Sequence, residues 1–190
     1  MNRFSTQYLL TCAAIGAGGG LLLIPANNIA AAVAAALPLL YAAIVGVWVV
    51  PSVVALDLIR RPGASVLTSL FAGLVLIPFT PYGVRSVITC LIFGVILELP
   101  FLATLYRRWS KWIFFGATLV LLALYSLLAY RTYAVETFEP WAQFAFFGLM
   151  LVSAVGFTAL ALLLSGRLRK AGVARGLRRQ SSTADAPAKV

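Results

Sequence analysis

Long apolar runs separated by short polar segments account for most of the chain. A helix needs about 20 apolar residues to cross the hydrocarbon core of a bilayer, and most of these runs reach that length. The pattern therefore predicts an all-α fold, a polytopic membrane protein with six transmembrane helices, one of them broken or bent. The expected spans cover residues 5–24, 28–59, 63–80, 86–106, 112–131 and 141–166.

The run 28–59 is the irregular one, because it is too long for one straight span and too short for two full ones. Pro38, Gly46 and Pro51 can interrupt it, since proline removes a backbone donor and kinks a helix. Interrupted helices occur at membrane depth where protein buries them or where they line a cavity. We expect one broken span here; the alternative is two spans, seven in all, with the N-terminus outside.

Basic residues gather in three places between or after the apolar runs: Arg60 with Arg61, Arg107 to Lys111, and Arg167 onward. Short loops rich in Lys and Arg mark the cytoplasmic side of membrane proteins. We therefore expect a multi-pass protein of the cell (plasma) membrane with both termini in the cytoplasm. Residues 1–166 form the expected transmembrane domain, and residues 167–190 form a basic, disordered cytoplasmic tail.

The other side of the membrane receives fewer charges in this topology. The loop before residue 141 contains Glu136 and Glu139, which suits an outer loop. Arg85 and Arg131 also fall there. A long basic side chain at that position either extends to the outer headgroups or faces a polar cavity.

The composition excludes several classes of protein. The chain of 190 residues is 62% hydrophobic, against roughly 45–50% in soluble domains. Its net charge of +10 does not indicate nucleic-acid binding, because the basic residues lie between apolar runs rather than on a soluble surface with exposed aromatic residues. With no His, no nucleophile elbow and no cluster of metal ligands, the sequence predicts neither an enzyme nor a metal site or cofactor. It also lacks the Gly-x-x-x-x-Gly-Lys phosphate loop, so an ATP-driven role requires a separate ATPase.

Glu98 is the most informative acidic residue, because it lies within an apolar run. It lies nine residues before Arg107, which at about 1.5 Å per residue places it about 13 Å deep, near the middle of the membrane. An acid there costs roughly 2.5–3.5 kcal/mol and usually faces a cavity, a substrate or a partner charge. Two roles are open, substrate contact and a structural pair with a neighbouring helix. Asp57, by contrast, precedes Arg60 and Arg61 by three and four residues, which favours a local ion pair.

Aromatic and small residues suggest further contacts. Tyr82 lies at an expected outer turn, where it belongs either to the interfacial aromatic belt or to the wall of a pocket. Tyr41 and Trp48 are seven residues apart and share a face if the chain is helical there. Ala13 and Ala17 are four residues apart in the first span, and small residues at that spacing let another helix approach closely. That helix belongs either to the same chain or to a partner subunit.

Several short motifs make the sequence resemble a known family. They are PLLYAAIVGVW from residue 38, RRPGA from residue 60, PYG from residue 81, Gly94 with Glu98, and RRW from residue 107. Together they resemble the substrate-binding (S) components of energy-coupling factor (ECF) transporters. Within that family the sequence is most similar to the YkoE branch, which is associated with thiamine and its hydroxymethylpyrimidine precursor. The resemblance covers most of the membrane region and leaves the tail unmatched.

The resemblance implies a six-helix transmembrane domain, residues 1–166, that binds a vitamin toward the outside. It also implies a membrane coupling (T) subunit and two ATPase subunits as partners of an ATP-driven importer. Ala13 and Ala17 match the Ala-x-x-x-Ala pattern through which members of the family dock. The alternative function is a stand-alone secondary carrier or channel for a small organic solute. Such carriers often contain inverted repeats, and the sequence shows no clear repeat.

Four residues are the candidates for substrate binding. Glu98 is the expected contact for a cationic ring, and Tyr82, Trp48 and Tyr125 are expected to stack against it, because aromatic faces attract cations. One position departs from the branch: Ser69 stands where the resemblance implies an acid. That departure leaves Glu98 as the main acid in the membrane region.

Overall fold

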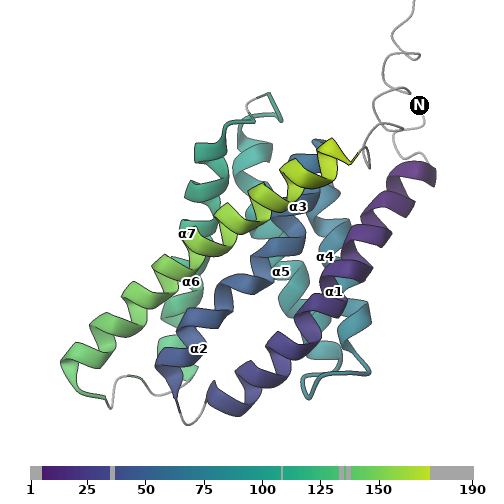
Figure 1. The fold of residues 1–190 in the computed structure, drawn as a ribbon. Coiled ribbons are helices and arrows are strands. Elements are labelled where there is room, and N and C mark those ends of the chain that lie inside the picture. The colour runs from purple at the N-terminus through teal and green to yellow at the C-terminus, as the bar shows by residue number, and fades with distance from the viewer. Residues whose placement is uncertain (1–5, 35–36, 108, 133–134, 136–137, 172–190) are drawn as a thin grey trace, which may run out of the picture.

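The computed structural model describes residues 6–34, 37–107, 109–132, 135 and 138–171. In that part the chain forms helices joined by turns and forms no strand, which confirms the all-α prediction. The elements, in chain order, are α1 (Thr6–Ala34), α2 (Pro38–Ile44), the 3-10 helix η1 (Val45–Val49), α3 (Val50–Ile59), α4 (Ala64–Leu76), α5 (Val84–Ala103), α6 (Lys111–Thr132) and α7 (Pro140–Lys170), as Figure 1 shows.

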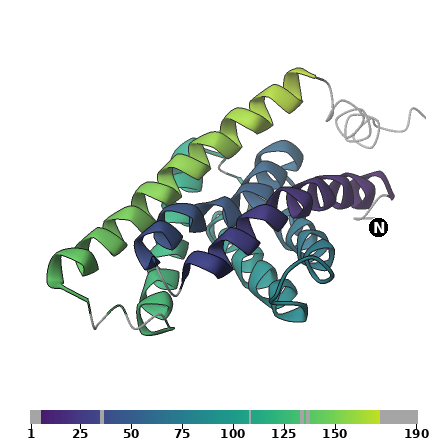
Figure 2. The same ribbon diagram turned by 60° about the horizontal axis from the view of Figure 1, so that its bottom comes forward.

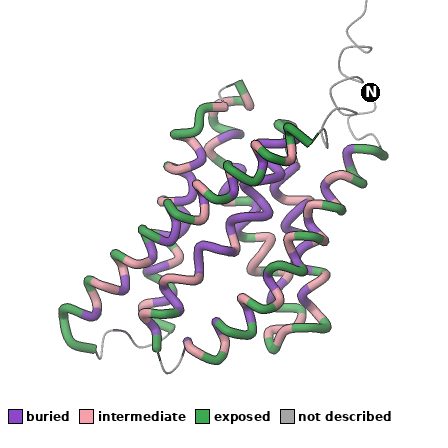
Figure 3. The backbone as a smooth tube through the Cα atoms, viewed as in Figure 1, coloured by how far each residue is buried: buried purple, intermediate pink, exposed green. Residues whose placement is uncertain are grey.

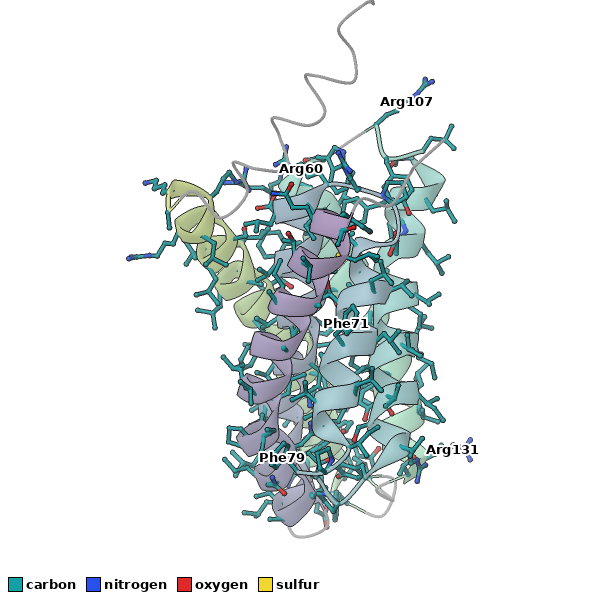
Figure 4. The ribbon with its side chains drawn as sticks, turned by 90° about the vertical axis from the view of Figure 1, so that its right-hand side faces the viewer. Arg60, Phe71, Phe79, Arg107 and Arg131 are labelled. Carbon is teal, nitrogen blue, oxygen red and sulfur yellow. The ribbon has the colours of Figure 1, made fainter. Side chains whose placement is uncertain are left out.

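The elements form one bundle with two distinct ends. Figure 4 shows Arg60 and Arg107 at one end and Phe79 and Arg131 at the other; we call these the basic end and the opposite end. Five elements within the described ranges are long and apolar enough to cross a membrane, and α4, with 13 residues, is a shorter apolar helix. The polytopic fold with six crossing elements, one of them interrupted, is therefore confirmed.

The interrupted element is the centre of the bundle. It runs through α2, η1 and α3, and it lies between α7 on one side and α1 on the other (Figures 1 and 2). Every residue of α3 is buried, and Figure 3 shows buried residues along most of the element. Such a position explains why the sequence is apolar all round here, since neighbouring helices cover most of the surface of the element.

The interruption at η1 is stabilised by α7. Gly46 has no side chain, and a Cβ there would lie 2.5 Å from the Ser153 hydroxyl oxygen of α7. The Gly46 N–H donates to Ser153 Oγ at 2.9 Å, and the same hydroxyl donates to the Ala43 carbonyl at 2.9 Å. A serine on the neighbouring helix thus binds backbone groups at the point where α2 gives way to the 3-10 turn.

The predicted beginning of the broken element, at residue 28, is wrong. Helix α1 continues through Pro25 and ends at Ala34, and the interrupted element begins at Pro38. The predicted first span stopped at residue 24, before Pro25 and the two asparagines at 27 and 28. In the fold, Asn28 Nδ2 instead donates to the Ile24 carbonyl at 3.0 Å, which keeps the asparagine compatible with a helix.

Close contact between α1 and α4 depends on glycines. A Cβ at Gly16 would lie 2.6 Å from the Cβ of Phe71 and 2.7 Å from the Thr68 carbonyl oxygen. Gly20 is similarly placed one turn later, against Val75. Part of the small-residue character of α1 therefore serves packing within the chain.

The predicted boundary between the transmembrane domain and the tail can be compared with the helices. Helix α7 continues to Lys170, so the first residues assigned to the tail at 167 are helical. The remainder of the expected tail, 172–190, lies outside the described residues, as do Arg108 and Glu136.

Candidate ligand-binding site

A cavity of about 430 Å³ lies at the opposite end of the bundle. Its lining comes from α1, η1, α4, the turn before α5, α5 itself and α6. Tyr82 and Arg85, at the start of α5, and Thr132, the last residue of α6, place the cavity at that end. Its size and its mixture of aromatic and hydroxyl groups are typical of a site for a small organic molecule.

Three aromatic rings form one wall of the cavity. The centroid of Trp48 lies 5.8 Å from that of Phe93 and 6.2 Å from that of Tyr125, and the last two are 5.2 Å apart. Behind them, the fully buried Tyr41 places its hydroxyl 2.5 Å from that of Tyr125. Edge-to-face rings at these distances hold one another in fixed orientations, so the wall is preformed.

The polar groups around the wall are mostly uncharged. Asn27, which is 3% exposed, faces the cavity from α1, and Ser86 and Thr89 face it from α5. Arg85 is the one charged residue among the described residues of the lining, and no carboxylate is among them. The position of Arg85 therefore agrees with the cavity-facing alternative for this residue.

The structure brings together three of the four predicted substrate residues. Trp48, Tyr82 and Tyr125 come from three different elements and line the same cavity. The sequence reasoning missed Phe93 and Asn27. A polar residue beside an apolar run was the available signal for Asn27, which fell between the predicted spans 5–24 and 28–59.

Glu98, the fourth predicted residue, is not part of the cavity lining. It is 6% exposed and lies near the basic end, where its carboxylate accepts hydrogen bonds from the backbone N–H of Gly63 and, at 3.3 Å, from that of Val66. Tyr106 donates its hydroxyl to the same carboxylate at 2.7 Å. The carboxylate thus binds the otherwise unpaired donors at the N-terminus of α4, where negative charge is also favoured by the helix dipole.

The depth calculated for Glu98 was too great because α5 does not continue to Arg107. The helix ends at Ala103, and Leu105 and Tyr106 have positive φ angles of 49° and 56°. The Tyr106 N–H donates back to the Phe101 carbonyl at 2.8 Å, so the chain folds toward Glu98. Two effects raise the pKa of Tyr106 above its ordinary value: mainly the burial of its hydroxyl, and also the neighbouring Glu98 carboxylate. The hydroxyl therefore stays protonated and can donate to Glu98.

The local pair predicted for Asp57 is present with Arg60, at 3.1 Å. The carboxylate has two further partners on α7: the Ser165 hydroxyl donates to it at 2.5 Å, and Arg169 forms a second ion pair. These partners lie 108 and 112 residues away in sequence. Asp57 therefore joins α3 to α7 at the basic end, a role that local spacing could not reveal.

The face of α1 that is predicted to dock a partner is partly exposed. Ala13 and Ala17 are half-buried, whereas Ala14 and Gly18 are exposed. Among the residues that the structure describes, no heavy atom comes within 4 Å of a Cβ built at Gly18. Contact of this face with another subunit stays a prediction.

Comparison with known proteins defines the class. The family described as "ABC-type cobalt transport system, permease component" matches residues 7–124, more than half of the chain. The chain therefore belongs to this family of transport-system membrane proteins, which agrees with the prediction that it is not an enzyme. A search of curated proteins found no match.

A solved structure identifies the fold more closely. The protein described as "Crystal structure of an S-component of ECF transporter" matches with a TM-score of 0.80 and 20% sequence identity, over 98% of this chain and 100% of that one. At this identity the match shows the fold alone. The chain thus has the fold of an ECF S component, as the sequence motifs implied.

Proposed function

We propose that the chain is the substrate-binding subunit of an ATP-driven importer and that its cavity binds thiamine or the hydroxymethylpyrimidine precursor. The observation that carries this proposal is the preformed wall of Trp48, Phe93 and Tyr125 in a bundle with the S-component fold. Flat heteroaromatic rings stack on such a wall, and Asn27 with the nearby hydroxyls can bind ring nitrogens and exocyclic groups. Trp48, Tyr82 and Tyr125 keep their proposed role; Glu98 does not.

The name of the family refers to cobalt, whereas the side chains that line the cavity favour an organic ligand. Divalent first-row metals are usually bound by imidazole, carboxylate or thiolate groups. The chain has no His. Cys90 is the one such donor among the described lining residues, and Arg85 repels a metal cation.

Partners follow from the same proposal. The sequence has no phosphate-binding loop, so a coupling (T) subunit and two ATPase subunits would supply the energy. The face of α1 around Ala13 and Ala17, with the exposed Ala14 and Gly18 beside it, is the proposed contact with the coupling subunit, because small side chains permit close helix packing. Placing the basic end in the cytoplasm would open the cavity toward the outside, where an importer meets its substrate.

Equilibrium binding to the purified chain in detergent tests the ligand class. Thiamine and hydroxymethylpyrimidine are titrated separately against the wild type and against Trp48→Phe. The smaller ring should lower the affinity of the ligand that binds about 3- to 10-fold, because part of the stacking area is lost. Trp112→Phe is the matched control, since Trp112 is 84% exposed on α6. Equal effects of the two variants, or no binding of either compound, would contradict the proposal.

A second measurement uses Cys90 as a reporter. In a Cys12→Ala background, bound ligand should slow the alkylation of Cys90 by a small membrane-permeant maleimide, because the thiol lines the cavity. The chain alone in liposomes should bind ligand without accumulating it. Accumulation driven by an ion gradient would favour the secondary-carrier alternative.

A further inference from the structure

The electrostatics of the cavity distinguish between the two ligands proposed above. Thiamine carries a permanent positive charge on its thiazolium ring, whereas hydroxymethylpyrimidine is neutral near pH 7. A cavity that binds the first would be expected to offer a carboxylate, because a desolvated cation needs a compensating charge. The described lining offers Arg85 instead.

The two acids that lie within the described helices, Glu98 and Asp57, have other partners. Glu98 binds the N-terminus of α4, and Asp57 binds Arg60 and Arg169; both sites lie near the basic end, away from the cavity. Ser69, at the position where the sequence motifs implied an acid, is buried and its hydroxyl lies 2.7 Å from that of Ser52. None of these three residues is in the cavity lining.

Helix dipoles do not replace the missing charge. Helices α1, α4 and α6 end at this end of the bundle, and α2, α5 and α7 begin there. Helix termini of both signs are therefore present in equal number at this end, and their partial charges offset each other. Arg85 adds the one full charge among the described lining residues.

We propose that Arg85 makes the cavity selective against cationic ligands, so that the neutral pyrimidine is retained and thiamine is discriminated against. This inference rests on the proposed function, because it concerns the ligand of the same cavity. Two unit charges about 7 Å apart at an effective dielectric constant of about 20, after screening by physiological salt, change affinity on the order of tenfold. Arg85 is thus a specificity-determining residue rather than a contact required by every ligand.

The test compares ligands that differ in charge and not in shape. Thiamine and its neutral isostere 3-deazathiamine, together with hydroxymethylpyrimidine, are titrated against the wild-type chain and against Arg85→Gln. The wild type should bind the neutral isostere on the order of tenfold more tightly than thiamine. Arg85→Gln should bring the two affinities together, mainly by strengthening thiamine binding.

Two control variants separate this effect from a general change in surface charge or folding. Arg131→Gln removes a positive charge at the same end of the bundle (Figure 4), from a residue outside the cavity lining. It should leave the ratio of the isostere affinity to the thiamine affinity unchanged. Arg85→Lys keeps the charge and should keep the discrimination. Raising the ionic strength should reduce the preference of the wild type for the neutral isostere over thiamine, because salt screens a charge at the mouth of a cavity.

The outcomes separate the inference from the proposed function. If the wild type binds thiamine as tightly as its isostere, or if Arg85→Gln shifts both ligands equally, the selectivity role of Arg85 is refuted while the ligand class stands. If the wild type binds none of the three compounds, the proposed function and this inference both fail.

Discussion

The hydrogen bonds of Glu98 lead to a prediction that distinguishes a structural role from a role in substrate binding. The substitution Glu98→Gln keeps the length and shape of the side chain. It replaces one acceptor oxygen by an amide NH2, which cannot accept a hydrogen bond from the backbone N–H of Gly63 or Val66. It also removes the negative charge at the N-terminus of α4.

The magnitude follows from the three hydrogen bonds of the carboxylate. A buried N–H that loses its acceptor costs about 1–3 kcal/mol, and hydrogen bonds that lose a charged partner weaken from about 1.5–3 to about 0.5–1.5 kcal/mol each. Allowing for relaxation of the turn, we expect a loss of about 2–4 kcal/mol in the free energy of unfolding. For a chain of this size that corresponds to a fall of about 5–15 °C in the melting temperature.

The assay measures melting temperature and ligand affinity on the same detergent-purified samples. Glu98→Gln should melt at a lower temperature, and the fraction that stays folded should bind ligand with unchanged affinity. Glu139→Gln is the control, because Glu139 is exposed and precedes α7 without a side-chain capping hydrogen bond. A variant that melts like the wild type but binds ligand tenfold more weakly would refute this reasoning and return Glu98 to the binding site.

Three further predictions concern packing, topology and docking. Gly16→Ala should lower stability by about 1–3 kcal/mol in a thermal melt, because the new methyl group would overlap α4, whereas Gly18→Ala, on the open face of the same helix, should be neutral or stabilising by up to about 1 kcal/mol. In a background without native cysteines, Arg131→Cys should react with an impermeant maleimide added to intact cells and Arg107→Cys should not; the reverse pattern would invert the proposed orientation. Ala17→Trp should reduce co-purification of the coupling subunit and uptake while ligand binding persists, and normal assembly would place docking on another face.

The spans could be predicted from the sequence because lipid imposes a strong constraint on it. A helix must satisfy all of its backbone groups internally at membrane depth, so each apolar run had one available structure. Pro38, Gly46 and Pro51 indicated an interrupted element for the same reason. The apolar runs could not show that α1 continues past residue 24. Within that continuation Asn28 donates to the Ile24 carbonyl one turn earlier and to the Phe79 carbonyl in the loop after α4, contacts that the sequence does not reveal.

The candidate site was predictable only in part. Aromatic residues from distant positions, Trp48, Tyr82 and Tyr125, meet at the cavity as expected from their type and from the family motifs. The environment of Glu98 was not predictable, because it depends on two residues with positive φ that fold the chain back after Ala103. Residue spacing along an assumed straight helix carries no information about such a turn.

The short length of α4 has a consequence for the surrounding lipid. Its 13 residues extend about 20 Å, against about 30 Å for the hydrocarbon core, and they lie beside α1, which has 29 residues. The turn that follows passes Phe79, whose carbonyl accepts a hydrogen bond from Asn28 Nδ2 at 3.2 Å, so backbone there is satisfied by protein rather than by water. The helical part of α4 is therefore shorter than the hydrocarbon core of an ordinary bilayer is thick. A short span favours local thinning of the bilayer, at a fraction of a kcal/mol for each Å of mismatch, so we expect the protein to be more stable in bilayers of shorter acyl chains.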